Sequence, residues 1–512
     1  MLAGRAALLR ATAEQDDGRV WAALADSFEA GDRGRSLALA GLLAGVREDG
    51  DGDETMRSWQ QAATEWSAAF ERLLAAYEGA SDETTPLAQE LTRVDDELVA
   101  TEAALESKRP GILADARALP PTPRLAELQE FIPADACVLQ YHLVGRDLMT
   151  WVVTDQTIAG HHVRLPAALE GQIGTYWRSC AAGAAWDEDA ELARLLLDPA
   201  ADVLRDRRRA IVVPFGALSS VPFHTLSFDG HALGDDHVLS YLPAASLLAG
   251  RSVDAPLTRS DVLVVGDPAF DPDAHPSLRR LPGAAVEAAA VGRAWGSADV
   301  LVDAEAEEPT VRELLPGRGI VHFAAHGRLD EIAPSTSSLI LAGADELTVS
   351  DLIGLRADSE LALLSACDSG RGTATLGGDV VGLTRGLIAA GVQRAIVSLW
   401  PVDDMAACVT MATFHERLAD HAVPAVALAE AQASMQELDA QQIAARYREL
   451  GGDPGVDMRS ARRGPDSGAI SVPPRRIAMN PQFVDIADDD PELGQLDGSL
   501  ERIWAPFVMV GV

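Results

Sequence analysis

Residues 319–327 read Gly-Ile-Val-His-Phe-Ala-Ala-His-Gly, and residues 361–370 read Leu-Ala-Leu-Leu-Ser-Ala-Cys-Asp-Ser-Gly. Each segment is a short apolar run that ends at a reactive side chain, His326 or Cys367, followed by small, turn-forming residues. Short apolar runs with such boundaries are typical of buried strands. In an open α/β sheet, ligands bind beyond the carboxyl ends of the strands. If the two runs are neighbouring parallel strands, the imidazole and the thiol lie at the same end of the sheet.

The rest of the chain supports such a sheet. Helical stretches separate the later apolar runs, and this alternation predicts crossover connections and a largely parallel sheet, which is an α/β fold class. The other predicted strands cover residues 136–144, 148–155, 209–215, 261–265, 394–399 and 504–511. The predicted helices cover residues 284–295, 379–390, 403–418 and 425–438.

A change in composition separates a predicted helical region from a predicted α/β region. Residues 1–118 are rich in alanine, leucine and glutamate, and their apolar residues recur at helical spacing, as in Trp59, Trp66 and Phe70, so a helical hairpin or bundle is expected. An α/β region follows the proline-rich linker at 120–123.

The α/β region contains a segment, at about 440–500, that is rich in glycine, proline and charged residues. This composition predicts a long surface loop. A solvated insertion without a role and a regulatory or self-cleavage loop both remain open as interpretations.

The bulk composition restricts the possible partners. The 512 residues include 42 Lys and Arg against 78 Asp and Glu, for a formal net charge of -36. Binding to a phosphate backbone depends on basic side chains, so direct binding of nucleic acid is not expected.

The four cysteines form no disulfide-framework or CxxC spacing, and we find neither a signal-peptide core nor an apolar run long enough for a membrane. A cytoplasmic protein without a metal or another cofactor is expected.

A thiol beside an imidazole is suited to nucleophilic acyl transfer. In the expected mechanism the Cys367 thiolate attacks a peptide carbonyl, His326 delivers a proton to the leaving amine, and the N–H groups of Gly327 and Cys367 stabilise the oxyanion. Asp368 opposes thiolate formation by like-charge repulsion unless Arg371 offsets its charge or Asp368 points away. The other interpretation of Cys367 is a small buried residue that ends a strand. His322 is expected to be an interior histidine and not a metal ligand.

Several further motifs resemble those of one family, the CHAT domain, which belongs to the clan of caspases, separases and gingipains. The resemblance covers roughly residues 136–512 and rests on Val213-Pro214-Phe215-Gly216, Tyr241-Leu242-Pro243-Ala244-Ala245-Ser246, Leu281-Pro282-Gly283-Ala284, His326-Gly327, Leu364-Ser365-Ala366-Cys367, Gly382-Leu383-Thr384-Arg385, Ser398-Leu399-Trp400-Pro401-Val402-Asp403-Asp404 and the closing 504–511 run. It implies a caspase-like three-layer sandwich with a mostly parallel sheet and an N-terminal helical region. The sandwich would consist of a degenerate first half at residues 124–255 and a catalytic second half at residues 256–512. The resemblance also implies that His326 and Cys367 are the catalytic dyad.

The same resemblance suggests a biological setting and a substrate pocket. Family members occur in bacterial defence systems, where some activate gasdermin-like proteins, and many carry helical repeats that sense an activator. We find no such repeat here, so an activating protein or ligand at the helical region is an expectation only. Ser365, Trp400 and Asp403 match pocket positions, and Asp403 would suit an arginine or lysine side chain. An N-cap of the following helix is the equally weighted alternative for Asp403.

The sequence therefore predicts a cysteine endopeptidase that acts on a protein substrate. A scaffold or adaptor with a vestigial dyad is the main alternative, and acyl transfer other than proteolysis is a weaker one. We find no GxSxG elbow, phosphate loop or dinucleotide-binding fingerprint that indicates another enzyme class.

Overall fold

The computed structural model describes the chain with gaps. The described residues are 22–29, 31–32, 86, 90, 93–94, 97, 100, 124–144, 146–165, 169–182, 189–251, 255–276, 278–328, 337–348, 351–352, 355, 357–365, 387–388, 390–400, 402–421, 423–454 and 504–511.

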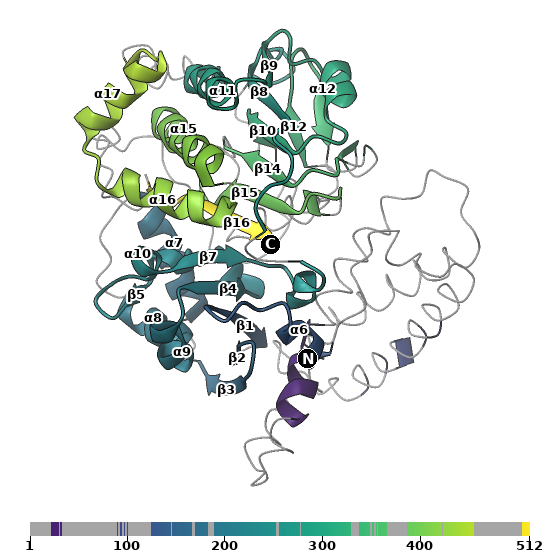
Figure 1. Cartoon of the computed structure of the whole chain (residues 1–512), viewed down its shortest axis with the longest axis vertical. Helices are drawn as coiled ribbons and strands as arrows, with labels where there is room; N and C mark the ends of the chain where they lie inside the picture. Colours follow the sequence, from purple (N-terminus) through teal and green to yellow (C-terminus); the bar gives the residue numbers. More distant parts are fainter. Residues whose placement is uncertain are drawn as a thin grey trace, which may run out of the picture.

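One large sheet runs through the described part of the chain (Figure 1). Its eleven strands follow the order β3-β2-β1-β4-β7-β16-β15-β14-β10-β8-β9, and all neighbours are parallel except β1–β2, β2–β3 and β15–β16. The predicted α/β fold with a mostly parallel sheet is confirmed. The strands are β1 (Ala136–Val144), β2 (Asp147–Val153), β3 (Ile158–Arg164), β4 (Arg209–Val213), β7 (Val238–Tyr241), β8 (Val262–Pro268), β9 (Asp299–Asp303), β10 (Ile320–Ala324), β14 (Leu361–Leu364), β15 (Arg394–Ser398) and β16 (Phe507–Gly511).

Smaller elements surround this sheet. β5 (Ser227–Phe228) pairs with β6 (His231–Ala232), and β11 (Gly327–Arg328), β12 (Ser338–Ile340) and β13 (Glu346–Thr348) form a separate three-stranded sheet. The α-helices whose full bounds are described from residue 125 onward are α6 (Leu125–Gln129), α7 (Leu169–Ala182), α8 (Asp189–Leu197), α9 (Ala201–Asp206), α10 (Leu233–Asp236), α11 (Pro282–Trp295), α12 (Glu308–Leu314), α15 (Asp404–His421), α16 (Pro424–Gln436) and α17 (Ala440–Leu450). Short 3₁₀ turns are η1 (Asp198–Ala200), η2 (Gly216–Ser220), η3 (Phe223–Thr225) and η4 (Ala245–Leu248).

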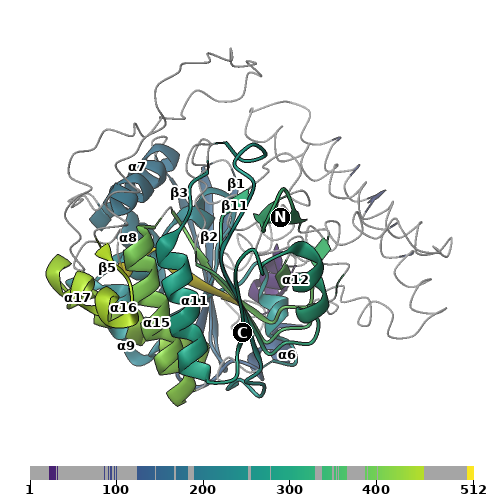
Figure 2. The same cartoon turned by 90° about the horizontal axis from the view of Figure 1, so that it is seen from above.

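Helices cover both faces of the sheet in its second half, so the arrangement has three layers (Figure 2). Strand residues alternate between faces, and the two apolar clusters follow this alternation. One face of β10 and β14, through residues such as Ile320 and Leu363, packs with α11 and α15. The opposite face, through residues such as Phe323 and Leu364, belongs to the cluster that contains Val311 of α12.

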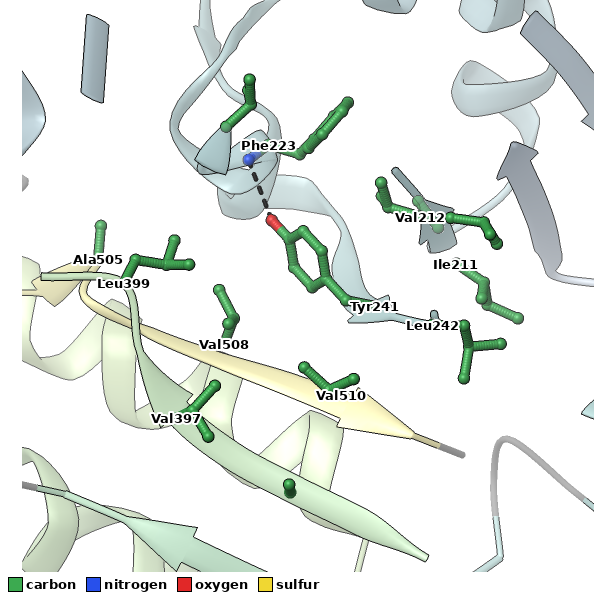
Figure 3. Packing of buried hydrophobic residues seen from close by; sticks show 14 of the residues in the cluster. Ile211, Val212, Phe223, Tyr241, Leu242, Val397, Leu399, Ala505, Val508 and Val510 are labelled. Carbon is green, nitrogen blue, oxygen red and sulfur yellow. Dashed lines mark hydrogen bonds between the residues drawn. The ribbon is translucent and has the colours of Figure 1, made fainter. Parts of the chain in front are cut away.

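The C-terminal strand joins the two halves of the sheet. β16 lies between β15, to which it is antiparallel, and β7, to which it is parallel. Figure 3 shows the apolar side chains at this junction, where Val508 and Val510 approach Tyr241. The Tyr241 hydroxyl accepts a hydrogen bond from the Phe223 backbone N–H at 3.0 Å. Residues more than two hundred positions apart thus share one core.

The described N-terminal residues 22–29 and 31–32 are helical and lie against the α/β body near α6 (Figure 1). Phe28 is buried in the main core, and the Asp32 carboxylate accepts the backbone N–H groups of Ala245 and Ser246 at 2.5 and 3.0 Å. The described positions within 1–118 are all helical. The apolar stripe at Trp59 and Trp66 and the linker at 120–123 lie outside the described residues.

One prediction was wrong. The surface loop expected at about 440–500 begins with a regular helix, α17, up to Leu450. Asp439 caps this helix by accepting N–H groups of Gln441 and Gln442, and Ile443, Tyr447 and Leu450 are buried on one face. Gly451, taken as part of a loop, is the left-handed residue that ends the helix, with φ 104°. Residues 455–500 of the predicted loop and most of the helix predicted at 379–390 lie outside the described residues.

Among the residues that the structure describes, no helix has both the length and the apolar character needed to cross a membrane.

Candidate functional site

The candidate site lies at the carboxyl ends of β10 and β14. These strands are parallel neighbours in which His322 pairs with Leu363 and Phe323 with Leu364, an offset of 41 residues. The ladder continues one step further, because the Ser365 backbone N–H donates to the Phe323 carbonyl at 3.1 Å. The sequence prediction that these two runs are adjacent and parallel is confirmed.

His326 follows β10 and is buried, with 3% of its surface exposed. Its Nε2 lies 2.5 Å from the main-chain carbonyl oxygen of Arg279. The ring of Phe270 meets the imidazole edge to face, with ring centroids 5.6 Å apart. The His326 carbonyl accepts the Ile340 N–H at 2.9 Å, so β12 also holds the backbone here. The imidazole is therefore held both through its ring and through its main chain.

The segment that contacts His326 is itself clamped by a buried carboxylate. Asp267, at the end of β8, accepts two hydrogen bonds from the Arg280 guanidinium, at 2.8 and 2.7 Å, and one from the Leu281 N–H at 2.9 Å. Arg280 also contacts Asp303. The hydrogen bond to Asp267 is the largest cause that raises the pKa of Arg280 above its ordinary value. A charged fork of this kind holds a loop in one geometry.

The predicted oxyanion residue Gly327 is buried next to His326, in β11. The predicted nucleophile Cys367 and its neighbour Asp368 lie outside the described residues. The structure therefore describes one member of the proposed dyad and the strand that leads to the other.

The three predicted pocket residues have different surroundings. Ser365 is buried, and its hydroxyl donates to Oε1 of Glu287 on α11. Trp400 is also buried. Asp403 is exposed, and its Oδ1 accepts the backbone N–H groups of Met405 and Ala406, both at 3.1 Å. Asp403 thus caps α15, which is the alternative considered for it. A role of these residues in binding substrate stays a prediction.

Sequence reasoning missed Glu287. This residue is 1% exposed, and its Oε1 lies 2.6 Å from Nε2 of His322, which is fully buried. The expectation that His322 is an interior histidine is confirmed. A single acidic residue in the alanine-rich helix 284–295 was the available signal, because a buried carboxylate requires hydrogen-bond partners.

The other three cysteines are buried and belong to the packed core. Burial raises the pKa of the Cys137 thiol to about 12. Cys180 and Cys408 lie on α7 and α15, with 4% and 0% of their surfaces exposed. Thiolates are the reactive form of cysteine, so these three are expected to be inert.

The model of one protein family, described as the CHAT domain, matches residues 189–512, which is more than half of the chain. The chain belongs to the CHAT-domain family. The matched range contains His326, Gly327 and Cys367, and it starts after β3, although β1 to β3 pair into the same sheet.

Known proteins match this CHAT-domain chain only in part. Tetratricopeptide repeat protein 28 of Mus musculus is 36% identical over 90 residues, which are 18% of this chain and 4% of that protein. Two structures of the separase–securin complex of Saccharomyces cerevisiae match with TM-scores of 0.39 and 0.38, both at 9% identity. They cover 81% and 74% of this chain but 36% and 34% of the matched chains. The chain thus spans only a small part of the mouse protein and about a third of each separase-complex chain. These structural likenesses are too weak to bear on function.

Proposed function

We propose that this CHAT-domain protein is a cysteine endopeptidase whose dyad is His326 and Cys367. The observation that carries the proposal is the strand register. His326 and Cys367 are 41 residues apart, and β10 and β14 pair with the same offset of 41. Adjacent strands lie about 4.8 Å apart, so residues at matching register positions are close neighbours.

The surroundings of His326 suit a general base. An imidazole that donates from Nε2 to the Arg279 carbonyl carries its basic lone pair on Nδ1. The carbonyl takes the part that an aspartate plays in other triads, because it selects one tautomer and orients the ring. In the proposed site, Nδ1 accepts the proton of the Cys367 thiol.

The proposed reaction is acyl transfer to sulfur followed by hydrolysis. The Cys367 thiolate forms a C–S bond to the substrate carbonyl, whose oxygen becomes an oxyanion stabilised by the N–H groups of Gly327 and Cys367. The carbon–nitrogen bond then breaks, and the His326 imidazolium gives its proton to the leaving amine. Water attacks the thioester with His326 as the base, and the free thiol returns.

The proposed partner is a protein. The net charge of -36 favours basic partner surfaces and disfavours nucleic acid. Asp403 and Trp400 are the proposed determinants of a basic residue before the scissile bond. From the family resemblance we also propose a role in bacterial defence or regulated proteolysis, with a gasdermin-like effector as a candidate substrate and an activating partner or ligand at the helical region. The proposed location is the cytoplasm.

A scaffold with a vestigial dyad is the second candidate. The docking of the N-terminal helical residues onto the body through Phe28 and Asp32 favours it, because a rigidly attached helix can present a partner surface. This candidate predicts partner binding that is unchanged in Cys367→Ala.

New protein amino termini distinguish the two candidates. The full chain and its variants are incubated with a bacterial lysate, and new termini are identified by mass spectrometry. Endopeptidase activity predicts termini that are lost in Cys367→Ala and in His326→Ala but kept in Cys408→Ala, a matched change at a buried thiol. Termini that persist in the first two variants, or the absence of any termini with partner capture intact, contradict the proposed dyad.

A further inference from the structure

Five polar side chains form a continuous chain of hydrogen bonds beneath the carboxyl end of β14. The Ser365 hydroxyl donates to Glu287 Oε1, and His322 Nε2 lies 2.6 Å from the same oxygen. His322 Nδ1 lies 3.0 Å from His415 Nε2 on α15. Trp295 Nε1, at the end of α11, donates to His415 Nδ1 at 2.9 Å. We call these residues the buried relay: Trp295, His415, His322, Glu287 and Ser365.

The direction of every hydrogen bond in the buried relay follows from its first donor. An indole N–H can only donate, so Nδ1 of His415 accepts and its proton is on Nε2. That proton is donated to Nδ1 of His322, whose own proton is therefore on Nε2 and is donated to Glu287. Both histidines are neutral in this arrangement. Burial, and after it the neighbouring His322, lowers the pKa of His415 well below its ordinary value, which agrees with this assignment.

Glu287 is therefore the final acceptor of the buried relay, because the hydrogen bonds from Ser365 and from His322 both end at its Oε1. A buried carboxylate is costly unless hydrogen bonds replace its hydration. Here one oxygen accepts from the Ser365 hydroxyl, directly after β14, and from the His322 imidazole on β10, so the carboxylate ties two neighbouring strands to α11.

The helix that carries Glu287 sits at a fixed height above the sheet. Gly266 of β8 lies beneath it, and a Cβ atom there would come within 2.4 Å of the Ala288 Cβ and 2.8 Å of the Ala284 carbonyl oxygen. This close approach leaves α11 little freedom to shift. The Glu287 oxygen is consequently a fixed anchor for Ser365.

We infer that Glu287 is a positioning residue that fixes the carboxyl end of β14 through the Ser365 hydroxyl. The proposed nucleophile Cys367 follows Ser365 by two residues, so fixing the strand end also restricts where the thiol lies. This effect on catalysis rests on the proposed function. Glu287 itself touches no substrate. Misplacing a reacting group by about 1 Å can cost about a hundredfold in rate, so such an anchor affects catalysis.

Two measurements on the folded full chain test the inference. The first is amide hydrogen exchange in peptides that cover residues 361–367. The second is the pH dependence of Cys367 alkylation by iodoacetamide, resolved by peptide mass spectrometry. The other three cysteines are buried, so the labelling of Cys367 is readily separated from theirs.

Glu287→Ala and Ser365→Ala are expected to speed exchange at the strand end about tenfold and to move the alkylation midpoint toward the value of a free thiol, about 8.5. The double variant is expected to be no worse than either single variant, because both remove the same link. Glu287→Gln keeps an acceptor oxygen in place and is expected to stay close to wild type.

Glu360→Ala is the matched control. This buried carboxylate accepts hydrogen bonds from Thr258 and Arg259 at the amino end of the same strand. The substitution therefore destabilises β14 without changing the contacts of Ser365. It is expected to leave the alkylation midpoint unchanged.

The outcomes separate the inference from the proposed function. If His326→Ala moves the alkylation midpoint but Glu287→Ala and Ser365→Ala do not, the positioning role is overturned. If His326→Ala has no effect, the dyad fails, and hydrogen exchange alone decides whether Glu287 holds the strand end. Unchanged exchange in both alanine variants overturns the inference in that case.

Discussion

The His326 imidazole is oriented by a main-chain carbonyl, that of Arg279, at 2.5 Å. A carbonyl cannot change its charge, so its effect depends entirely on where the loop holds it. The loop position in turn depends on Asp267, which binds Arg280 and Leu281. The base of the proposed dyad is therefore positioned from the end of β8, two strands away from the nucleophile strand.

Asp267→Asn is expected to lower the proposed peptidase kcat about tenfold with little change in KM, because it loosens the carbonyl that orients His326 rather than any substrate contact. The measurement is steady-state cleavage of a peptide derived from an identified site. Asp229→Asn is the matched control, since Asp229 also has positive φ and binds an arginine fork, that of Arg205, but it lies on the surface of the first half. An equal loss in both variants would exclude a specific effect on His326.

Asp403→Asn separates the two roles considered for this residue. Asparagine is as good an N-cap as aspartate, so α15 and the unfolding free energy are expected to stay within about 0.5 kcal/mol of wild type. If the carboxylate recognises a basic side chain, kcat/KM for substrates with arginine or lysine before the scissile bond falls about tenfold or more. Unchanged selectivity, with Asp403→Ala destabilising, would leave Asp403 as a helix cap only.

Asp32→Ala is expected to lower the free energy of unfolding by about 2–4 kcal/mol, because it leaves the buried N–H groups of Ala245 and Ser246 without their carboxylate acceptor. Chemical denaturation provides the measurement, and limited proteolysis is expected to cut within residues 22–32 first. Asp439→Ala is the control. Asp439 also accepts two successive backbone N–H groups, those of Gln441 and Gln442, but at an exposed helix start, so a loss of only about 1 kcal/mol is expected. Equal losses would mean that burial adds nothing at Asp32.

The protein is expected to lose stability in mild acid, because two buried histidines, His224 and His415, resist protonation in the folded state. Burial lowers the pKa of His224 from 6.5 to about 4 and that of His415 well below 6.5. Below about pH 6.5 the unfolded chain gains protons on these residues and the folded chain does not, so the free energy of unfolding falls as the pH drops toward 4. Each histidine contributes up to about 1.4 kcal/mol per pH unit in this range.

Urea denaturation between pH 7.5 and 5 measures this slope. His224→Gln is expected to reduce the slope, because it removes one of the two groups whose pKa is lowered by burial. A wild-type slope near zero would contradict the lowered pKa values of His224 and His415.

The sequence predicted the strands that carry the candidate site, because β10 and β14 are short apolar runs with clear turn residues after them. It also predicted the helices at 284–295 and 403–418 nearly to their ends, since α11 and α15 begin at a proline and after an aspartate cap. It failed at α17. There the helix signal from Asp439, Ile443 and Tyr447 was outweighed by the glycines and charged residues that follow.

Local sequence determined most of the strands and helices. The spacing of 41 residues between His326 and Cys367 is likewise a property of the sequence alone. Only the tertiary structure decided that β10 and β14 pair with that same offset, that Arg279 supplies the partner of His326, and that Glu287 holds Ser365. These contacts join segments far apart in sequence and depend on the height of α11 above the sheet and on a loop clamped by Asp267. Periodicity reports which face of an element is buried. The partner that a buried polar group finds on that face depends on how the elements pack.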